Sequence, residues 1–254
     1  METFLKGNFK SFIKLGVYKA KRKTNKVYLN VHGLYAMSGD IGSKSKLLGG
    51  KILESNIANV VQFSSSRAWN IFPSDGNYPK QQKAFAGKTF QQEANDLRDT
   101  IDLILDQSKL LFGVEKEKLR FYIVANSIGG TITSTLKDKF KYIDKIVLAG
   151  SGIRPSDSTK PILSTCPSEK EILDSAANFK GELLFLQGSK DDIVPIEAQN
   201  MLFASYKKAR KQKIIIEGAN HNFTKINEEN KRLAQKLYID FVSKFMAQKD
   251  SSKK

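Results

Sequence analysis

One serine stands where a strand-like run of residues changes abruptly into a helical pattern. Phe121–Val124 is aromatic and β-branched, as in a buried strand, and a helical pattern begins at Ile128. Ser127 therefore lies in a tight strand-to-helix turn, with Ala125 two residues before it and Gly129 two residues after it. Such a turn requires small residues at those two places, because strand and helix nearly touch there. In one interpretation, this turn lifts a nucleophilic serine hydroxyl clear of the sheet.

A structural role for the same serine is the alternative. Serine is a favoured N-cap, and a strand followed by a capped helix is common. Neither G-x-x-x-x-G-K nor G-x-G-x-x-G occurs at this turn, so we do not predict a phosphate-binding loop. The choice depends on whether the chain also supplies a base and an acid in the right order.

Only two histidines can supply the base. His221 lies in a polar loop that begins at Gly218, after a buried strand that begins at Lys213. A histidine beyond a strand end can reach the serine of a neighbouring strand, and its near-neutral pKa lets it accept and return a proton. A surface histidine in a polar loop is the alternative. His32 ends an earlier strand, and we expect it to stabilise its loop by hydrogen bonding.

An aspartate follows a further buried strand. Asp191 comes shortly after the apolar run Leu183–Leu186, and we assign it to orient His221 and to stabilise the imidazolium that forms during turnover. Asp192 is the alternative acid, although exposure or capping of the next helix fits it better. No further ligands stand at a suitable spacing, so we expect no metal site.

The fourth element is an early strand that ends in a glycine. Val27–Val31 is followed by His32-Gly33-Leu34, and a glycine there lets the next backbone N–H point into a cavity. We assign the oxyanion donors to the backbone N–H groups of Leu34 and Ile128. In other enzymes, the removal of one such donor raises the activation free energy by roughly 2.7–4 kcal/mol.

Together these segments resemble the α/β-hydrolase superfamily. The resembling motifs are histidine-glycine after an early strand, small-x-Ser-x-Gly, Gly-x-x-Asp-x-x-Val-Pro and a late Gly-x-x-His, in the chain order Ser, Asp, His. The resemblance runs from about Phe9 to the last helix. It implies that Ser127, Asp191 and His221 form a catalytic triad and that the chain folds around a mostly parallel sheet.

The resemblance also implies a reaction. Among the subgroups, the chain is similar to small serine esterases and to serine-aminopeptidase-like hydrolases. This similarity implies cleavage of carboxylic esters through an acyl-enzyme intermediate, without a cofactor. Thioester or amide hydrolysis on the same triad is one alternative. A binding protein without catalysis is another, since a fold does not dictate a function.

The rest of the chain predicts a single α/β-hydrolase domain over residues 1–254. Apolar strands alternate with amphipathic stretches, which favours a mostly parallel sheet with helices on both faces. The predicted helices are Phe90–Leu105, Ile128–Phe140, Ile196–Lys208 and Ile226–Ala247. The last of these should bury Leu233, Leu237, Phe241, Val242 and Phe245. An N-terminal hairpin is predicted over Phe9–Lys19 and Thr24-Asn25.

Two segments should control specificity. Ser64–Gly87 is too long for an ordinary connection, and loops of this length are usually functional or mobile. It contains Ser66-Arg67-Ala68-Trp69, where related hydrolases often have Arg-Gly-x-Gly-x-Ser, and its aromatic residues are Trp69, Phe72, Tyr78 and Phe85. Gly152–Asn178 is a short cap-like segment with room for one or two helices at most. We therefore expect a minimal cap and an open acyl site.

The formal net charge of +16 comes from lysines spread along the chain. Known nucleic-acid motifs are missing, so we predict no specific nucleic-acid partner, and a lysine-rich nucleic-acid binder is a third alternative. The basic tail, about 248–254, is expected to be solvated. A positive field raises encounter rates with anions, so the expected small acyl ester substrate could be anionic.

The single cysteine, Cys166, excludes an intramolecular disulfide and fits a reducing compartment. It lacks a neighbouring base, so we do not expect a nucleophilic thiol. No unbroken apolar segment of secretory or transmembrane length occurs. These features predict a cytoplasmic protein, with an organelle address in the basic N-terminus as the alternative.

Overall fold

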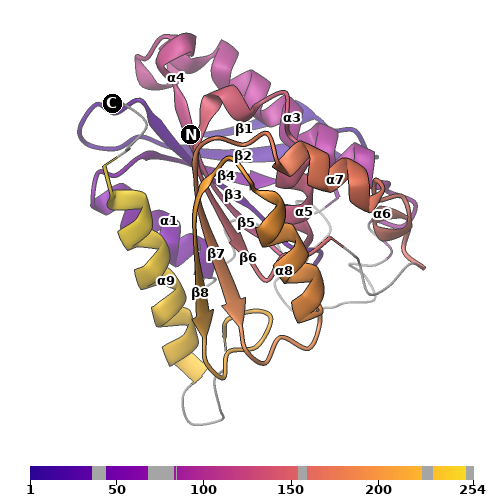
Figure 1. Cartoon of the computed structure of the whole chain (residues 1–254). Helices are drawn as coiled ribbons and strands as arrows, with labels where there is room; N and C mark the ends of the chain where they lie inside the picture. Colours follow the sequence, from indigo (N-terminus) through magenta and orange to yellow (C-terminus); the bar gives the residue numbers. More distant parts are fainter. Residues whose placement is uncertain (36–43, 68–82, 84, 154–158, 225–230, 250–254) are drawn as a thin grey trace.

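The computed structural model describes residues 1–35, 44–67, 83, 85–153, 159–224 and 231–249 (Figure 1). Its strands are β1 (Glu2–Lys6), β2 (Phe12–Tyr18), β3 (Lys26–Val31), β4 (Asn59–Ser64), β5 (Arg120–Asn126), β6 (Ile143–Ala149), β7 (Glu182–Gly188) and β8 (Arg210–Ile216). Its α-helices are α1 (Lys44–Glu54), α3 (Phe90–Asp106), α4 (Ser108–Phe112), α5 (Ile128–Ser134), α6 (Pro161–Ser164), α7 (Glu169–Ala176), α8 (Ile196–Ser205) and α9 (Lys231–Ala247). Short 3-10 turns lie at Lys116–Lys118 and Phe140–Tyr142.

The strands form one eight-stranded sheet in the order β1-β2-β4-β3-β5-β6-β7-β8. The pairs β1–β2 and β2–β4 are antiparallel, and every later pair is parallel. The prediction of a mostly parallel sheet is confirmed. Parallel strands end at the same edge of a sheet, and ligand sites in open α/β sheets lie outside that edge. The carboxyl ends of β7 and β8 point toward the lower edge in Figure 1.

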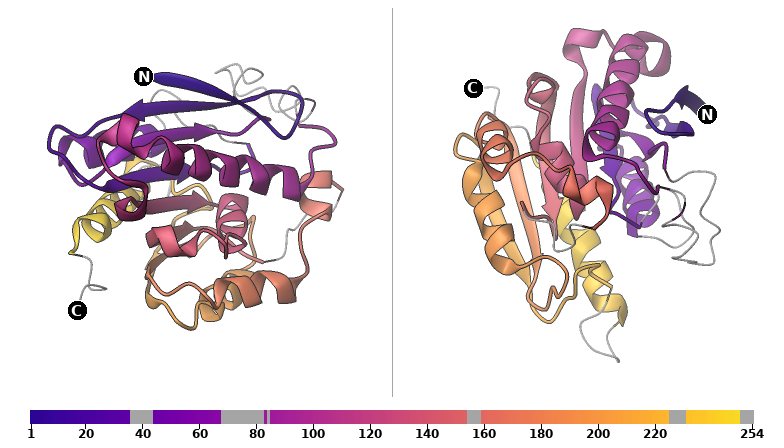
Figure 2. Two further views of the ribbon diagram at one scale, coloured as in Figure 1. Left: turned by 90° about the horizontal axis from the view of Figure 1, so that it is seen from above. Right: turned by 90° about the vertical axis from the view of Figure 1, so that its right-hand side faces the viewer.

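Helices cover both faces of this sheet. In Figure 1, α1 and α9 lie on one side, and α3, α5, α7 and α8 lie on the other. Figure 2 shows the β1–β2 hairpin at one end of the molecule and β7 and β8 at the other. Successive residues of the central strands supply the two apolar layers: Ile123 packs in the layer under α3, and Val124 packs in the layer under α9.

The predicted N-terminal hairpin was wrong in its extent. Its strands are Glu2–Lys6 and Phe12–Tyr18, so the turn lies at Gly7–Ser11, where the Gly7 N–H donates to the Ser11 carbonyl. Residues of β1 alternate between half-buried and exposed, because β1 is an edge strand held by β2 alone. Because an edge strand buries few of its side chains, the apolar alternation in its sequence is weak. The sequence therefore did not predict a strand at Glu2–Lys6.

Two predicted helices end earlier than expected. The helix predicted over Ile128–Phe140 ends at Ser134, and the one predicted over Ile196–Lys208 ends at Ser205. The hydroxyls of Ser134 and Ser205 each donate to a carbonyl of the preceding turn, and such bonds compete with the regular helix ladder. The helix predicted from Phe90 is confirmed, with a capping box at its start.

The last helix is described from Lys231, and residues 225–230 lie outside the described residues. Val242 and Phe245 are buried and Leu237 is half-buried, as predicted. The prediction for Leu233 was wrong, because 42% of its side chain is exposed. Figure 1 shows the first turn of α9 below α1, the helix against which α9 packs.

The described part of the cap-like segment contains the helices α6 and α7, within the predicted limit of two helices. Helix α6 packs against α3, and α7 packs against α5 and α8. In the long segment after β4, Phe85 is buried in the core, whereas Trp69, Phe72 and Tyr78 lie outside the described residues. Among the described helices, none is long and apolar enough to cross a membrane.

Candidate active site

Ser127 occupies a strained turn directly after β5. Its backbone angles are φ 54° and ψ −128°, and its N–H donates to the Ala149 carbonyl at 2.9 Å. A capping serine has extended backbone angles and accepts a hydrogen bond from the helix. Within the part of the chain that the structure describes, the Ser127 side chain makes no capping bond to α5. The N-cap interpretation is therefore wrong, and the half-buried side chain is presented at the sheet edge.

The residues that flank this turn are small for a steric reason. A Cβ built on Gly129 would lie 2.7 Å from the His32 carbonyl oxygen and 2.9 Å from that of Val31. Ala125 is fully buried. The first turn of α5 thus lies almost against the end of β3, which confirms the predicted need for a small residue at position 129.

His221 and Asp191 form a close pair after β8 and β7. The Nδ1 atom of His221 lies 2.9 Å from Oδ2 and 3.0 Å from Oδ1 of Asp191. The Asp191 side chain is inaccessible to solvent, and that of His221 is 10% exposed. Asp192 is exposed. The structure therefore brings together the predicted base and the preferred acid, and leaves the alternative acid in solvent.

The surroundings of Asp191 keep it ionised. Burial would raise its pKa, but hydrogen bonds from His221 and from the N–H groups of Val194 and Ile193 hold the pKa of this carboxyl below its usual value. The Gln199 side-chain amide donates to Oδ2 at 3.0 Å. An ionised carboxylate only accepts, so Nδ1 of His221 carries the proton and Nε2 is the basic nitrogen.

The loops that carry the acid and the base are packed as one unit. The Lys190 N–H donates to the Ala219 carbonyl at 3.0 Å, and the Gly218 N–H donates to Ser189 Oγ at 2.8 Å. A Cβ built on Gly188 would lie 2.4 Å from the Ala219 carbonyl oxygen. These contacts fix the distance between the two loops and so hold the acid against the base.

Gly150 is a site residue that the sequence reasoning missed. It follows β6 with φ +57°, and a Cβ built on it would lie 3.1 Å from Nδ1 of His221 and 3.2 Å from Oδ2 of Asp191. The preceding residue, Ala149, accepts the Ser127 N–H. One dipeptide therefore contacts all three predicted triad residues. The only signal in the sequence was a second small-residue run, Ala-Gly-Ser-Gly, directly after a strand.

Lys44, at the start of α1, was also missed. Its ammonium donates to the Asn222 carbonyl at 2.8 Å and lies 5.0 Å and 4.8 Å from the ring centroids of Phe223 and Tyr238. Burial lowers the pKa of Lys44 to about 7, against the opposing charge of Asp191. This lysine ties α1 to the residue directly after His221.

The predicted oxyanion donors flank the serine. A Cβ built on Gly33 would lie 3.4 Å from Ser127 Cβ, which brings the loop containing Leu34 directly against Ser127. Ile128 is the first residue of α5, and the N–H groups of a first helical turn have no acceptor within their helix. The assignment of Leu34 and Ile128 stays a prediction that this arrangement supports.

His32 has the structural role that we expected. Its Nε2 accepts from the Ser65 N–H at 3.2 Å, so the proton is on Nδ1, which lies 3.0 Å from the Gly33 carbonyl oxygen and donates to it. Its ring stacks on Phe63. Burial, with the Arg67 charge nearby, lowers the pKa of His32 to about 4, so the imidazole is neutral at pH 7.

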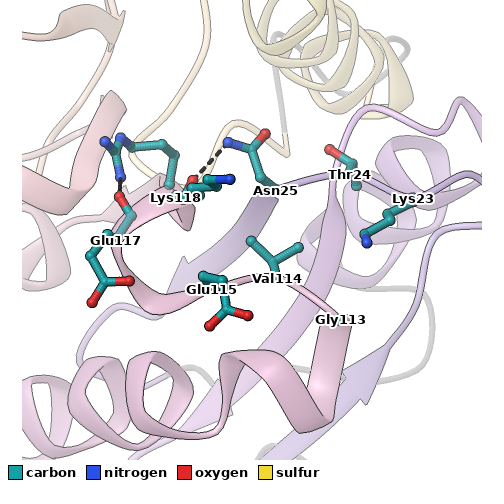
Figure 3. Close-up of a pocket in the computed structure, with 9 residues that line it drawn as sticks. Lys23, Thr24, Asn25, Gly113, Val114, Glu115, Glu117 and Lys118 are labelled. Atoms are coloured by element: carbon teal, nitrogen blue, oxygen red, sulfur yellow. Dashed lines mark hydrogen bonds between the residues drawn. The ribbon is translucent and has the colours of Figure 1, made fainter.

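Other candidate groups lie elsewhere. Burial raises the pKa of the Cys166 thiol to about 12, so it is not a thiolate at neutral pH. Among the described residues, no three His, Cys, Asp or Glu side chains are grouped to hold a metal ion. A cavity of about 560 Å³ lies where β3 and β5 begin, at the opposite edge of the sheet from Ser127 (Figure 3). Two of the lining side chains donate to backbone carbonyls of the lining, Asn25 to that of Lys118 and Arg120 to that of Glu117.

No protein-family model matches the chain, and no curated protein matches it in sequence. Solved structures match it in fold. Est1E from Butyrivibrio proteoclasticus has a TM-score of 0.66 at 13% identity, over 96% of this chain and 97% of Est1E. A thermostable carboxyl esterase from Bacillus coagulans has a TM-score of 0.67 at 12% identity, over 97% and 98%. An alpha-beta serine hydrolase homologue from Coxiella burnetii has a TM-score of 0.61 at 12% identity, over 96% of each chain.

The chain therefore has the α/β-hydrolase fold, as its sequence motifs predicted. The sequence identity to these proteins is 12–13%, and the similarity is one of fold. Many functions share this fold, so the chemistry must be argued from the residues at the strand ends.

Proposed function

We propose that this chain is a serine hydrolase that cleaves carboxylic esters through Ser127, His221 and Asp191. The observation that carries the proposal is the contact of the Ala149–Gly150 dipeptide with all three residues, by a 2.9 Å hydrogen bond to Ser127 and by the close approach of Gly150 to His221 and Asp191. The three residues follow three different strands. The similar fold of a protein described as a carboxyl esterase favours esters over other acyl compounds.

The first step uses the His221 tautomer set by Asp191. With its proton on Nδ1, His221 accepts the Ser127 proton at Nε2 while the serine Oγ attacks the ester carbonyl carbon. The buried carboxylate of Asp191 then stabilises the imidazolium. The strained turn of Ser127 holds the attacking oxygen above the sheet edge.

The tetrahedral intermediate carries its negative charge on the former carbonyl oxygen. The N–H groups of Leu34 and Ile128 would stabilise this oxyanion, because both flank Ser127. His221 returns the proton to the leaving alcohol, which departs and leaves an acyl group on Ser127. Water then attacks the acyl-enzyme with His221 again as base, and the carboxylic acid is released.

Replacing the nucleophile tests the proposal. Ser127→Ala should melt near the wild-type temperature and lose hydrolysis of p-nitrophenyl acetate and butyrate by on the order of 10⁴-fold or more. A fluorophosphonate probe should label the wild type and the control Ser164→Ala, but not Ser127→Ala. Undiminished turnover by Ser127→Ala would falsify the assignment. A wild type that neither hydrolyses nor becomes labelled would support the non-catalytic binding protein instead.

We further propose that the substrate is a small acyl ester and that anionic esters react faster. The net charge of +16 would attract them, and salt screens such attraction with a Debye length of about 10 Å at 0.1 M. Raising the salt concentration should therefore lower kcat/KM for a succinate monoester and leave that of the matched neutral methyl ester unchanged. Equal salt effects on the two would remove this part of the proposal. Assays with thioesters and amides of the same acyl group test the alternative reactions.

A further inference from the structure

A buried arginine holds the loop that carries the predicted oxyanion donor. Arg67 follows β4, and its side chain is inaccessible to solvent. Its Nη2 donates to the Gly33 carbonyl at 2.9 Å, and its Nη1 donates to the Leu34 carbonyl. The guanidinium thus bonds two consecutive carbonyls, a contact that its planar fork allows and a single ammonium does not.

The direction of one peptide group follows from this contact. The Gly33 carbonyl and the Leu34 N–H belong to the same planar trans peptide, so they point in opposite directions. Arg67 and the Nδ1 proton of His32 both bind the carbonyl. The Leu34 N–H therefore points away from the arginine, in a loop that packs directly on Ser127.

The arginine is itself held in place by a buried carboxylate. Glu93, on α3, lies with Oε2 3.1 Å from Nε of Arg67 and 2.8 Å from the ammonium of Lys88. Burial alone would raise the pKa of Glu93, but the charges of Arg67 and Lys88 lower it well below its usual range. Glu93 is thus ionised, and its charge pairs with that of the buried Arg67 guanidinium.

Lys88 provides an internal comparison. It shares Glu93 with Arg67, and it also bonds Asp96 at 2.6 Å and Ser66 Oγ at 2.9 Å. Its contacts therefore join α3 to the segment that follows β4. Both cations contribute to the same buried network, but Arg67 is the one bonded to the carbonyls of Gly33 and Leu34.

We propose that Arg67, anchored by Glu93, is a positioning residue that orients the Leu34 N–H toward the oxyanion. The proposal rests on the proposed hydrolase function, because an oxyanion exists only if Ser127 attacks an acyl group. Arg67 itself does not touch the substrate. It acts by fixing the orientation of the Gly33–Leu34 peptide group before the reaction. Without this contact, the peptide group would have to reorient during the reaction, which would lower the rate.

The test compares three variants with the wild type on p-nitrophenyl butyrate. Arg67→Met removes both carbonyl contacts, and Arg67→Lys keeps a cation beside Glu93 but loses the fork. Each should lower kcat, by on the order of 10²-fold for Arg67→Met, with KM changed less than about threefold. Lys88→Met breaks the same network without a contact to the loop, so it should lose stability but keep kcat within about threefold of wild type.

A transition-state analogue separates positioning from general damage. A trifluoromethyl ketone forms a hemiketal oxyanion with the catalytic serine, so its Ki should rise by the same factor as kcat/KM falls across the Arg67 variants. If Arg67→Met does not fold, the same measurements on Arg67→Lys test the proposal. Wild-type kcat in a folded Arg67 variant, or an equal loss of kcat in Lys88→Met and Arg67→Lys, would overturn the positioning role. If the proposed hydrolase function itself is wrong, the wild type will show no Ser127-dependent turnover, and this result differs from both outcomes that overturn the positioning role.

Discussion

Both carboxylate oxygens of Asp191 lie within hydrogen-bonding distance of Nδ1 of His221, at 2.9 Å and 3.0 Å. The same carboxylate accepts two backbone N–H groups and the Gln199 amide, so it is held from several sides. A carboxylate fixed in this way allows one imidazole tautomer, with the basic nitrogen away from the acid.

Replacing Asp191 by asparagine should therefore abolish most of the activity. The amide of Asp191→Asn can donate to Nδ1, which would place the imidazole proton on the wrong nitrogen and lower kcat by on the order of 10⁴-fold. The neighbouring substitution Asp192→Asn is the matched control and should keep kcat within about threefold, because Asp192 is exposed. Initial rates of ester hydrolysis measure both. A larger loss in Asp192→Asn would identify that residue as the acid.

Adding one methyl group at Gly150 should disturb the acid–base pair. Gly150 and Gly87 both have positive φ, of 57° and 85°, so alanine costs about 1–2 kcal/mol at either position. The new methyl in Gly150→Ala would press on His221 and Asp191, whereas no atom of the described residues lies within 4 Å of the corresponding Cβ at Gly87.

We expect Gly150→Ala and Gly87→Ala to lower the free energy of unfolding by similar amounts. Only Gly150→Ala should lower kcat/KM, by about tenfold or more, because displacement of a catalytic group by a fraction of an ångström is costly. Urea titrations and initial rates on the same preparations give the two measurements. Full activity in Gly150→Ala would contradict the contact that carries the proposed site.

The neutral, buried imidazole of His32 should make the fold sensitive to acid. Its pKa is about 4 in the folded protein and 6.5 in an ordinary histidine. Between these values the unfolded chain binds a proton that the folded chain does not, so the free energy of unfolding falls as the pH drops from 6.5 to 4. The loss reaches about 3 kcal/mol.

Urea unfolding at pH 7.0, 5.5 and 4.5 measures this loss. His32→Gln should be less stable at every pH, because the bonds to Ser65 and Gly33 change, but its stability should fall less between pH 6.5 and 4. If the wild type and His32→Gln lose stability equally in this range, then other groups cause the acid sensitivity.

A buried lysine far from Ser127 should affect stability alone. Lys145, on β6, donates to the carbonyls of Phe245 and Gln248 at the end of α9, at 3.1 Å and 2.6 Å. Lys145→Met would leave these carbonyls without that donor and lower the free energy of unfolding by roughly 2 kcal/mol. The exposed Lys141→Met should change it by less than about 0.5 kcal/mol. Rates at 15 °C should match the wild type in both, and a lower kcat in Lys145→Met would link α9 to catalysis.

The predicted triad residues were recognisable because each follows an apolar strand. Parallel strands end at one edge, so Ser127, Asp191 and His221 could be expected near one another from strand order alone. Gly150 could not be found in this way, because its importance depends on how the loops after β7 and β8 fold over it. The burial of Arg67 and the partial burial of Lys44 were hidden for a similar reason. A lysine-rich sequence does not reveal which few cations lie inside.

Helix ends were harder to predict than helix positions. Ser134 and Ser205 fit an apolar helical pattern as well as neighbouring residues do, and only their side-chain bonds to the preceding turn mark the actual ends. Leu233 continues the apolar face of α9, but the sequence of α9 does not show how far the neighbouring helix α1 extends along it. Local sequence patterns thus predicted where the helices lie, whereas side-chain bonds and tertiary packing determine where they end.

The backbone of Ser127 has a wider consequence for engineering this protein. Non-glycine residues avoid its combination of φ 54° and ψ −128°, at a cost of about 1–3 kcal/mol. Glycine would relieve that cost, so we expect Ser127→Gly to stabilise the fold and to inactivate the proposed hydrolase. Selection for heat tolerance alone would favour the loss of the proposed nucleophile, so directed evolution of this chain needs a simultaneous screen for turnover.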